Sequence, residues 1–535
     1  MARLVHDLIT EAARLWPDRP ALAYKDQSLG YAELAARTAS AAKGLAACRL
    51  DRGARVAVYL EKRLETVIGI LAATMAGGSF VPVNPLLKPH QVGYILRDCE
   101  VRILITSRQR LAGLREELQS CPGLQAVVLV DGAADTEEAP AQEILTWEDL
   151  LDQPEAAAGA SQGAIDSDLA AILYTSGSTG NPKGVVLSHR NIVAGAESVA
   201  QYLENRPEDR ILSLLPLSFD AGLSQITTAF TAGAKLVLMN YLLPRDVVRL
   251  CARERITGLT CVPPLWLQLA ELEWPSEASR HLRYFANTGG HMPAGTLARL
   301  RGIFTEAKPY LMYGLTEAFR STYLDPKQVD ERPNSIGKAI PNAEVMVVRP
   351  DGSRCAPGEH GELVHRGALV SLGYWGDPER TAERFRPAPG QDPSLPLPEP
   401  AVWSGDIVYT DEEGFIYFVG RRDEMIKTSG YRVSPTEVET VINATGLVTE
   451  AVALGVPHPT LGQAIVVAVA PAAGTAFDPE ALKEACKRQL PLYMVPSIVA
   501  ERGALPRNPN GKIDRALLKQ EFSQAFSNQE ANDGQ

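Results

Sequence analysis

Cysteine is scarce in this chain. Its seven cysteines, at positions 48, 99, 121, 251, 261, 355 and 486, are odd in number, irregular in spacing and include no Cys-x-x-Cys pair. This pattern excludes a disulfide framework and a cysteine zinc site, so we expect reduced thiols. Histidine is also sparse, and the pair His360 and His365 lacks a His-Glu-x-x-His pattern. The sequence therefore predicts no permanent metal.

Long apolar runs and an excess of positive charge are missing as well. No stretch approaches the ~18 apolar residues that a membrane-spanning helix needs, and an amphipathic helical pattern starts directly after Met1. Lys and Arg total 53 against 64 Asp and Glu, a net charge of -11, whereas nucleic-acid binding favours a basic surface. We expect a cytoplasmic protein with no transmembrane segment and no nucleic-acid partner.

The length of 535 residues predicts two or more domains. Apolar segments that alternate between strand and helix spacing predict two sets of parallel α/β layers in the first part of the chain. Residues 132–165, rich in Ala and Glu, are predicted to be a surface excursion. From residue 335 short strands with Gly and Pro turns predict a β-rich subdomain. Beyond Gly420 a new strand–turn–helix pattern predicts a small α+β domain, so we place the large domain at 1–420 and the small one at 421–535.

The most informative stretch lies between two apolar runs and is rich in glycine and hydroxyl groups. Its sequence is Tyr174-Thr175-Ser176-Gly177-Ser178-Thr179-Gly180-Asn181-Pro182-Lys183-Gly184. Glycines let the backbone approach an oxyanion, the hydroxyls and successive N–H groups can donate to phosphate oxygens, and Lys183 adds a positive charge. A strand, a phosphate-cradling loop and a second strand are predicted. The loop is not a Walker A motif, because glycine follows Lys183 where Ser or Thr would hold magnesium; a P-loop kinase or ATPase is therefore disfavoured.

Four later segments are less specific when each is taken alone. Glu317, in Tyr313-Gly314-Leu315-Thr316-Glu317, is either a carboxylate that holds Mg²⁺ at a strand tip or an exposed turn residue. Asp406, after Gly405, is either a turn former or an acceptor for both hydroxyls of a vicinal diol. Residues 420–439 taken alone predict a charged linker and a turn. Lys512 follows the turn signal Asn510-Gly511 and by itself predicts a solvated cation.

Together these segments closely resemble the motifs of the AMP-forming adenylating ligases, which include acyl-CoA synthetases, peptide-synthetase adenylation domains and luciferases. The motifs occur in family order from residue 174 to 512, and the likeness covers nearly the whole chain. In its pocket motif the chain is most similar to stand-alone amino-acid-activating enzymes. The resemblance implies a large domain that binds ATP with Mg²⁺, and a small mobile C-terminal domain.

The resemblance also implies a role for each matching residue. The phosphate loop would comprise Thr175, Ser176, Gly177, Ser178, Thr179, Gly180 and Lys183. Adenine would lie against Gly289, Gly290 and Tyr313, while Gly314 and Thr316 would lie beside phosphate. Glu317 would bind magnesium, and Asp406 with Arg421 would hold the ribose hydroxyls. Asp423 would be the hinge, Gly430 would lie where a pantetheine arm enters, and Lys512 would swing in to grip the carboxylate and the α-phosphate. The catalytic residues would be Thr179, Lys183, Glu317 and Lys512.

The nature of the acid is predicted from Phe219-Asp220. Amino-acid-activating relatives carry Phe-Asp here, and the aspartate pairs with the substrate ammonium because a buried charge needs a partner; alternatively, Asp220 caps the following helix. By spacing, the other pocket walls are predicted to be Ala221, Ser224, Cys261, Ala286, Thr288, Met312, Arg320 and Ser321. These side chains are mostly small or polar, which favours a short polar substrate. If Arg320 faces the pocket, it could pair with an acidic group of the substrate.

The activity implied is a two-step ligation. A carboxylate attacks the α-phosphate of ATP to give an acyl- or aminoacyl-adenylate and pyrophosphate, and after the small domain rotates, a phosphopantetheine thiol displaces AMP to give a thioester. Because the chain stops about twenty residues after Lys512, we expect an amino acid to be loaded onto a separate acyl or peptidyl carrier protein. The alternatives are ligation of a small or medium acid to coenzyme A and, from another class, a catalytically silent adenylate-binding protein.

Overall fold

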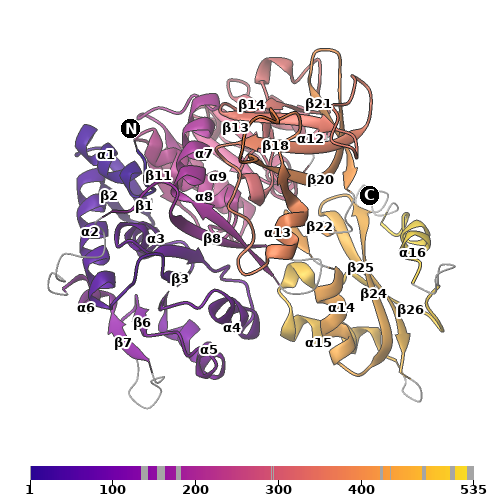
Figure 1. Ribbon diagram of the computed structural model, residues 1–535, viewed down its shortest axis with the longest axis horizontal. Helices are drawn as coiled ribbons and strands as arrows, with labels where there is room; N and C mark the ends of the chain where they lie inside the picture. Colours follow the sequence, from indigo (N-terminus) through magenta and orange to yellow (C-terminus); the bar gives the residue numbers. More distant parts are fainter. Residues whose placement is uncertain are drawn as a thin grey trace.

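The computed structural model describes residues 2–133, 142–152, 163–175, 182–290, 292, 294–421, 426–433, 435–472, 477–506 and 513–526. The chain forms a large N-terminal unit, up to residue 421, and a smaller C-terminal unit that starts at residue 426 (Figure 1). All seven cysteines are described and unpaired. Within the described ranges, we find no helix whose length and hydropathy together suit a membrane crossing.

The first sheet of the large unit has seven strands in the order β7-β6-β5-β3-β4-β8-β9. Its neighbours are parallel except at the β8–β9 edge. Strands β4, β5 and β6 are buried along their whole length, as expected for a parallel sheet covered on both faces. The strands are β3 (Arg55–Tyr59), β4 (Ser79–Pro82), β5 (Ile103–Thr106), β6 (Ala126–Leu129), β7 (Glu143–Thr146), β8 (Leu169–Thr175) and β9 (Lys183–Ser188). The helices in this part of the chain are α1 (Asp7–Leu15), α2 (Tyr31–Ala47), α3 (Leu64–Met75), α4 (Pro89–Asp98), α5 (Arg108–Gln119), α6 (Trp147–Leu151) and α7 (His189–Tyr202).

The second sheet follows the path β17-β18-β20-β21-β16-β15-β14-β13-β12-β10-β11-β1-β2, with β19 paired to β20. Parallel α/β strands occupy its middle, and the predicted β-rich segment continues the same sheet by antiparallel pairing from β14 onward. The strands are β1 (Pro20–Tyr24), β2 (Gln27–Gly30), β10 (Arg210–Ser213), β11 (Lys235–Leu238), β12 (Gly258–Cys261), β13 (Tyr284–Asn287), β14 (Lys308–Tyr313), β15 (Thr322–Leu324), β16 (Ser335–Ala339), β17 (Ala343–Val348), β18 (Gly361–Gly367), β19 (Phe385–Pro387), β20 (Pro400–Thr410) and β21 (Ile416–Arg421). The helical segments are α8 (Asp220–Thr231), α9 (Pro244–Glu254), α10 (Pro263–Ala270), α11 (Ser276–Ser279), α12 (Ala294–Ile303), α13 (Pro378–Arg384), η2 (Thr316–Ala318) and η3 (Pro326–Gln328).

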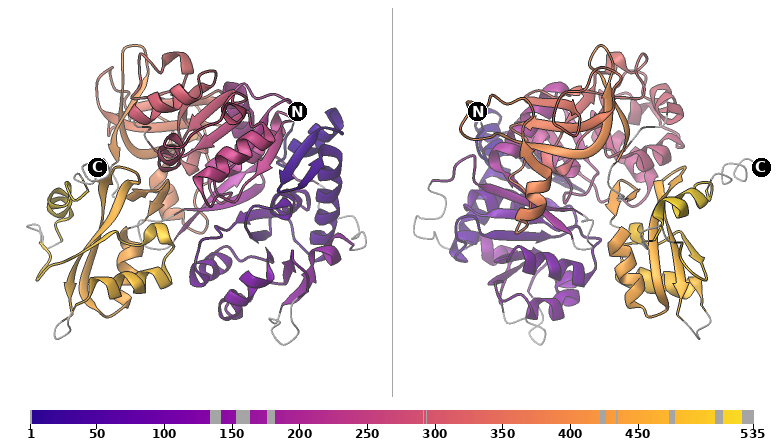
Figure 2. Two further views of the ribbon diagram at one scale, coloured as in Figure 1. Left: turned by 180° about the vertical axis from the view of Figure 1, so that it is seen from behind. Right: turned by 45° about the vertical axis from the view of Figure 1, so that its right-hand side comes forward.

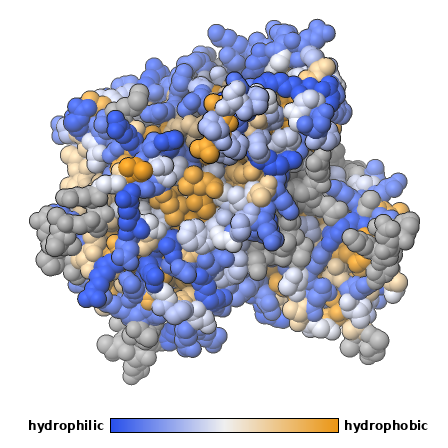
Figure 3. Space-filling view, viewed as in Figure 1, coloured by the Kyte–Doolittle hydropathy of each residue, from blue (hydrophilic) through white to orange (hydrophobic). Residues whose placement is uncertain are grey.

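The two sheets share one hydrophobic core. Side chains from both sheets join in one buried cluster, for example Val56 of β3 and Leu236 of β11, together with Ile70 of α3, Ile192 of α7 and Ile226 of α8. Apolar faces of helices that lie between two sheets are buried on both sides, so the sheets cannot move independently. On the face shown in Figure 3 hydrophilic side chains predominate, and an apolar group is visible near the middle of the large unit.

The prediction for residues 132–165 was partly wrong. The chain here adds strand β7 to the edge of the first sheet, paired with β6, and then turns into helix α6. A capping box between Thr146 and Asp149 starts that helix, and Trp147 and Leu150 are buried. Two large apolar side chains are enough to anchor a short helix, although the segment as a whole is poor in them.

The C-terminal unit has a sheet of its own, with the path β23-β22-β25-β24 and β26 paired to β25. Its elements are β22 (Ile426–Thr428), β23 (Tyr431–Val433), α14 (Pro435–Ala444), β24 (Val448–His458), β25 (Gly462–Pro471), α15 (Pro479–Gln489), η4 (Leu492–Met494), β26 (Ile498–Glu501) and α16 (Arg515–Glu521). In both views of Figure 2 this unit lies to one side of the large unit. The predicted fold class, a large α/β unit with a β-rich segment and a smaller α+β unit, is confirmed; the boundary after residue 420 stays a prediction.

Candidate active site

The base of the predicted phosphate loop is a two-stranded ladder. Strands β8 and β9 pair antiparallel, and Thr175 lies opposite Lys183 in the register. The two predicted strands on either side of the loop therefore occupy the expected positions. Ser176, Gly177, Ser178, Thr179 and Gly180 lie outside the described residues.

Lys183 and Glu317 form a buried ion pair. The Nζ atom of Lys183 lies 3.1 Å from Oε1 of Glu317 and 2.8 Å from the hydroxyl of Tyr374. The Tyr374 hydroxyl in turn donates to the same Oε1 at 2.6 Å. The side chains of Lys183 and Glu317 are 17% and 3% exposed. Sequence reasoning missed Tyr374, and its only local signal is an aromatic pair between two glycines, Gly373 and Gly376.

The charges around this pair keep Glu317 ionised. Burial opposes its ionisation, but the positive charges of Lys183, Arg432 and Arg384 and the Tyr374 hydrogen bond hold its pKa well below the usual range. Burial lowers the pKa of Lys183, and the neighbouring carboxylate counteracts that effect. Arg384 and Arg432 are further residues that sequence reasoning missed. The result is a concentration of positive charge around one buried carboxylate.

A strained turn connects Glu317 to the pocket beside it. Phe319 has φ 56° and ψ -57°, and the Arg320 N–H donates to the Ala318 carbonyl across it at 2.6 Å. These angles define a γ-turn that bulky residues rarely adopt. The Phe319 ring is buried against Gly195 of α7, where an added Cβ would lie 2.5 Å from the ring. Packing therefore fixes the turn and sends Glu317 and Arg320 to opposite sides of it.

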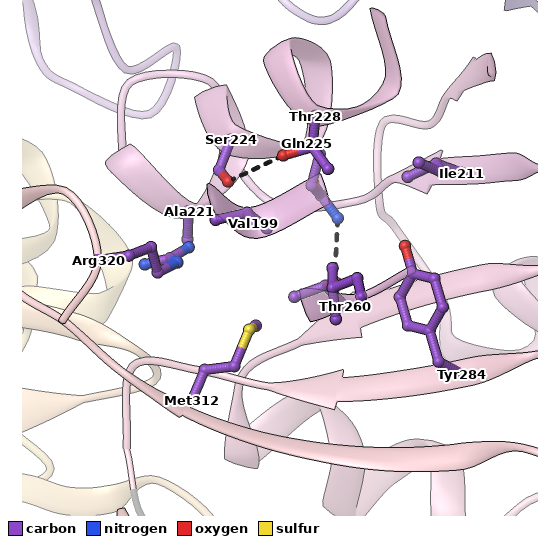
Figure 4. A pocket seen from close by; sticks show the side chains of 11 residues that line it. Val199, Ile211, Ala221, Ser224, Gln225, Thr228, Thr260, Tyr284, Met312 and Arg320 are labelled. Atoms are coloured by element: carbon purple, nitrogen blue, oxygen red, sulfur yellow. Dashed lines mark hydrogen bonds between the residues drawn. The ribbon is translucent and has the colours of Figure 1, made fainter. Parts of the chain in front are cut away.

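A small cavity lies next to this turn. Figure 4 shows the side chains of Ser224, Arg320 and Met312 around it, from helix α8, the γ-turn and strand β14. The full lining is Val199, Leu203, Ile211, Ala221, Ser224, Gln225, Thr228, Thr260, Tyr284, Met312 and Arg320. Polar and apolar side chains alternate around a small space, which suits a short substrate with polar groups.

Asp220 and Arg320 form a second ion pair at this cavity. Nη1 of Arg320 lies 3.0 Å from Oδ2 of Asp220, and the two side chains are 3% and 16% exposed. Arg320 thus faces the pocket. Asp220 is the first residue of α8 and makes no capping hydrogen bond, so the alternative interpretation of Asp220 as a helix cap is wrong. The aspartate is held by a cation of the protein before any substrate arrives.

The predicted pocket walls are only partly those of the cavity. Ala221, Ser224, Met312 and Arg320 line it as predicted. For this cavity Cys261 is corrected to Thr260, because side chains alternate along β12 and Cys261 packs into the core cluster on the other face. The remaining predicted walls, Ala286, Thr288 and Ser321, are buried but do not line the cavity. The Ser321 hydroxyl lies 2.9 Å from Nδ1 of His365. Phe219 lines a different cavity, between the two units.

The residues predicted to hold the nucleoside also cluster. The Tyr313 hydroxyl donates to Oδ2 of Asp406, and Asp406 lies directly opposite Arg421 in the β20–β21 ladder. Gly289 has φ 76°, and Asn287 donates to the Gly290 carbonyl at 2.8 Å, which closes the turn. Gly314 and Thr316 follow β14 at the same end of the sheet.

The C-terminal unit approaches this site with its first hairpin. A Cβ at Gly430 would lie 3.1 Å from the Val262 side chain, and Gly430 has φ 81°. The rings of Tyr431 and Phe219 meet edge to face at 5.1 Å. The predicted thiol-channel glycine therefore contacts the large unit. The predicted hinge Asp423 and the predicted mobile cation Lys512 lie outside the described residues.

Two family models match the chain. The AMP-binding enzyme model covers residues 9–375, and the model of the AMP-binding enzyme C-terminal domain covers residues 437–512. The chain belongs to the AMP-binding enzyme family, and the resemblance inferred from its motifs is confirmed.

The relatives fall into two functional groups. The chain is 30% identical to the L-proline–(L-prolyl-carrier protein) ligase of Pseudomonas fluorescens. The match covers 96% of this chain and 99% of that protein. It is 32% identical to the sulfoacetate–CoA ligase of Cupriavidus necator, with 96% of each chain covered. It is 29% identical to tyrocidine synthase 3 of Brevibacillus parabrevis; the match covers 96% of this chain but spans only 8% of that much longer protein. Family membership thus gives an AMP-binding enzyme and leaves the acid and the acceptor open.

Solved structures show the same fold. A variant of the o-succinylbenzoate CoA synthetase of Bacillus subtilis, bound with its product analogue, is 27% identical and superposes with a TM-score of 0.82, covering 96% of this chain and 97% of that chain. The same enzyme in complex with its acyl-adenylate intermediate gives a TM-score of 0.67 over the same shares. As a whole, the chain therefore superposes better on the product-analogue complex than on the adenylate complex.

Proposed function

We propose that this chain is an ATP-dependent ligase that forms an acyl- or aminoacyl-adenylate, releases pyrophosphate and then makes a thioester on a phosphopantetheine thiol. The observation that carries the proposal is the buried pair of Lys183 and Glu317, joined at 3.1 Å, one turn away from the pocket pair of Arg320 and Asp220, joined at 3.0 Å. A cation and a carboxylate that suit nucleotide phosphates lie beside a cavity that suits a small acid.

In this proposal the nucleotide occupies the end of the second sheet. Residues 175–180 and Lys183 bind its phosphates, and Asp406 with Arg421 holds the ribose hydroxyls. The burial of Asp406 and its contact with Tyr313 support this role, since they give the carboxylate a fixed orientation. Adenine lies against Tyr313 and Gly290.

Glu317 fits a magnesium ion that arrives with the nucleotide. It is buried and ionised, and carboxylate oxygens are ligands that Mg²⁺ prefers. Among the described residues no group of three or more His, Cys, Asp and Glu side chains could hold a metal ion. In this proposal the remaining ligands are phosphate oxygens and water. The bound ion would supply positive charge beside the phosphates.

The first step brings two anions together. The oxygen of the acid attacks the α-phosphorus, the bond to the leaving pyrophosphate breaks, and a cation placed between them stabilises the charge. We assign that cation to Lys512, carried by a small domain at 421–535 that turns about Asp423. In the second step the thiol sulfur attacks the acyl carbon near Gly430, the bond to the AMP oxygen breaks, and the thiol proton passes to solvent.

For the acid we propose an amino acid, loaded onto a separate carrier protein. Asp220 supports this choice, because it pairs through Oδ2 with Arg320, which lines the cavity, and its second carboxylate oxygen can accept a hydrogen bond from a substrate ammonium. The second candidate is a small acid ligated to coenzyme A. The same ion pair favours this candidate, because Arg320 already neutralises Asp220 and can itself pair with a second anionic group.

The test is an ATP–pyrophosphate exchange panel of amino acids, small dicarboxylic acids, fatty acids and aryl acids. Acids that give exchange are then offered coenzyme A or a phosphopantetheinylated carrier protein, and the thioester is trapped. Exchange with an amino acid and thioester on the carrier support the proposal; thioester on coenzyme A supports the second candidate. ATP binding without exchange for any acid would indicate a silent adenylate-binding protein.

A further inference from the structure

A second cavity lies between the large unit and the C-terminal unit. Thr175 and Pro182, on either side of the phosphate loop, line it from the large unit, and Tyr431 and Tyr493 line it from the C-terminal unit. Phe219, next to the pocket aspartate, closes its inner end. A long, thin thiol arm that passes between the units would reach the acyl group by this route.

Gln91 and Glu437 join the two units at the wall of this cavity. Nε2 of Gln91 donates to Oε1 of Glu437 at 2.8 Å, across 346 residues of sequence. In Figure 1, α4 and α14, which carry these residues, face each other at the junction of the units.

The geometry of Gln91 is fixed before the units meet. Gln91 is the third residue of α4, and its Oε1 accepts from the backbone N–H of Lys88 at 3.0 Å, which satisfies an N–H at the start of the helix. Because the oxygen is engaged within the large unit, the amide nitrogen points outward toward Glu437. Gln91 is only 5% exposed, so this direction is held by packing as well.

Glu437 moves with α14 and the C-terminal sheet as one body. Any large rotation of that unit, such as the one that would bring Lys512 to the phosphates, has to break its bond to Gln91. The bond exists in a structure that as a whole superposes better on the product-analogue complex of the Bacillus subtilis synthetase, with a TM-score of 0.82, than on its adenylate complex, with 0.67.

We propose that Gln91 and Glu437 are positioning residues that hold the C-terminal unit in the orientation for thiol transfer. The inference rests on the proposed function, because it assigns the bond to the second half of the reaction. If the pair has this role, adenylate formation does not depend on Gln91 and Glu437, whereas thioester formation does.

A polarity swap tests the pair. Gln91→Glu keeps an acceptor for the Lys88 N–H, and therefore the helix cap, but replaces the donor that faces Glu437 by a carboxylate. Glu437→Gln keeps an acceptor for Gln91. The double variant restores a donor–acceptor pair with the polarity reversed. The control is Gln119→Glu, the same change at an exposed position of α5.

We expect Gln91→Glu to slow thioester formation about tenfold, as for the loss of a hydrogen bond between the units, with pyrophosphate exchange unchanged. The rate is measured in single turnover from preformed adenylate, with coenzyme A and with carrier protein as thiols. Glu437→Gln alone and the control should stay close to the parent, and the double variant should recover most of the rate. Equal loss in both half-reactions, or no recovery in the double variant, would overturn the inference.

A measurement without substrates separates this inference from the proposed function. Hydrogen–deuterium exchange of the peptides that cover α4 and α14 should rise in Gln91→Glu and return in the double variant. Absence of pyrophosphate exchange with every acid would refute the proposed function, while the exchange of these peptides would still decide whether the pair holds the units together. Unchanged hydrogen–deuterium exchange in Gln91→Glu would refute the role of the pair in holding the units together.

Discussion

Exchanging Glu317 for glutamine removes the charge that balances Lys183 and leaves the shape of the side chain nearly unchanged. In the structure Oε1 of Glu317 accepts from Lys183 at 3.1 Å and from Tyr374 at 2.6 Å. A glutamine oxygen can still accept these hydrogen bonds, so the main loss is the Coulomb partner of a buried ammonium. Leaving one member of a buried ion pair uncompensated costs about 3–5 kcal/mol.

This cost translates into a modest change in melting temperature. With an unfolding entropy of about 2.1 cal/mol/K per residue, 1 kcal/mol shifts the Tm of a unit of roughly 400 residues by about 1 °C. We therefore expect Glu317→Gln and Lys183→Met each to lower the Tm of the large unit by about 3–5 °C. The double variant should recover most of that loss, because no unpaired charge stays buried.

Scanning calorimetry without nucleotide or magnesium measures the effect on the fold alone. The control is Glu204→Gln at the exposed pair with Lys308, whose side chains are 59% and 47% exposed; no measurable shift is expected there. Additive losses in the double variant would refute the reasoning, because they would mean that Lys183 and Glu317 contribute independently.

Three further predictions concern the pocket, the strained turn and the interface. Arg320→Met should raise the KM for the preferred acid about tenfold or more and leave the KM for ATP unchanged in pyrophosphate exchange; a parallel rise of both would contradict a role in the acid pocket. Gly195→Ala should push on the Phe319 ring and destabilise by about 1–3 kcal/mol, whereas Gly113→Ala, where a Cβ meets nothing within 4 Å, should not destabilise; calorimetry compares the two. Burial raises the pKa of Glu437 from 4.5 to about 7, so folding binds a proton there; its stabilising effect is complete below pH 4.5 and is lost as the pH rises to about 7. Glu437→Gln should weaken this pH dependence when stability is measured by hydrogen–deuterium exchange of the α14 amides. An unchanged pH dependence would show that another group titrates.

The local motifs predicted the two strands beside the proposed phosphate loop, because apolar runs in the sequence mark strands. Glycine, hydroxyl groups and Lys183 stand together in sequence, and the ladder of β8 and β9 brings Thr175 opposite Lys183 as expected. Glu317 could be predicted for the same reason. Tyr374 could not, because its contact with Glu317 spans 57 residues and comes from a loop with no pattern of its own.

The pocket was predicted less well because a strand position decides which way a side chain faces. Spacing indicated Cys261, but alternation along β12 turns Thr260 into the cavity. The sequence analysis paired Asp220 with a substrate ammonium and Arg320 with an acidic substrate group, whereas in the structure the two side chains pair with each other. The bond from Gln91 to Glu437 depends on how two separately folded units meet, which no local pattern encodes.

The central claim is that a cation from the C-terminal unit and the buried site of the large unit act on the same phosphate. The direct test is Lys512→Ala, assayed separately for pyrophosphate exchange and for thioester formation from a supplied acyl-adenylate. We predict that exchange falls at least about a hundredfold, as for the loss of a charge that stabilises the transition state, while thioester formation survives. Normal exchange in this variant, or equal loss of both half-reactions, would contradict the account.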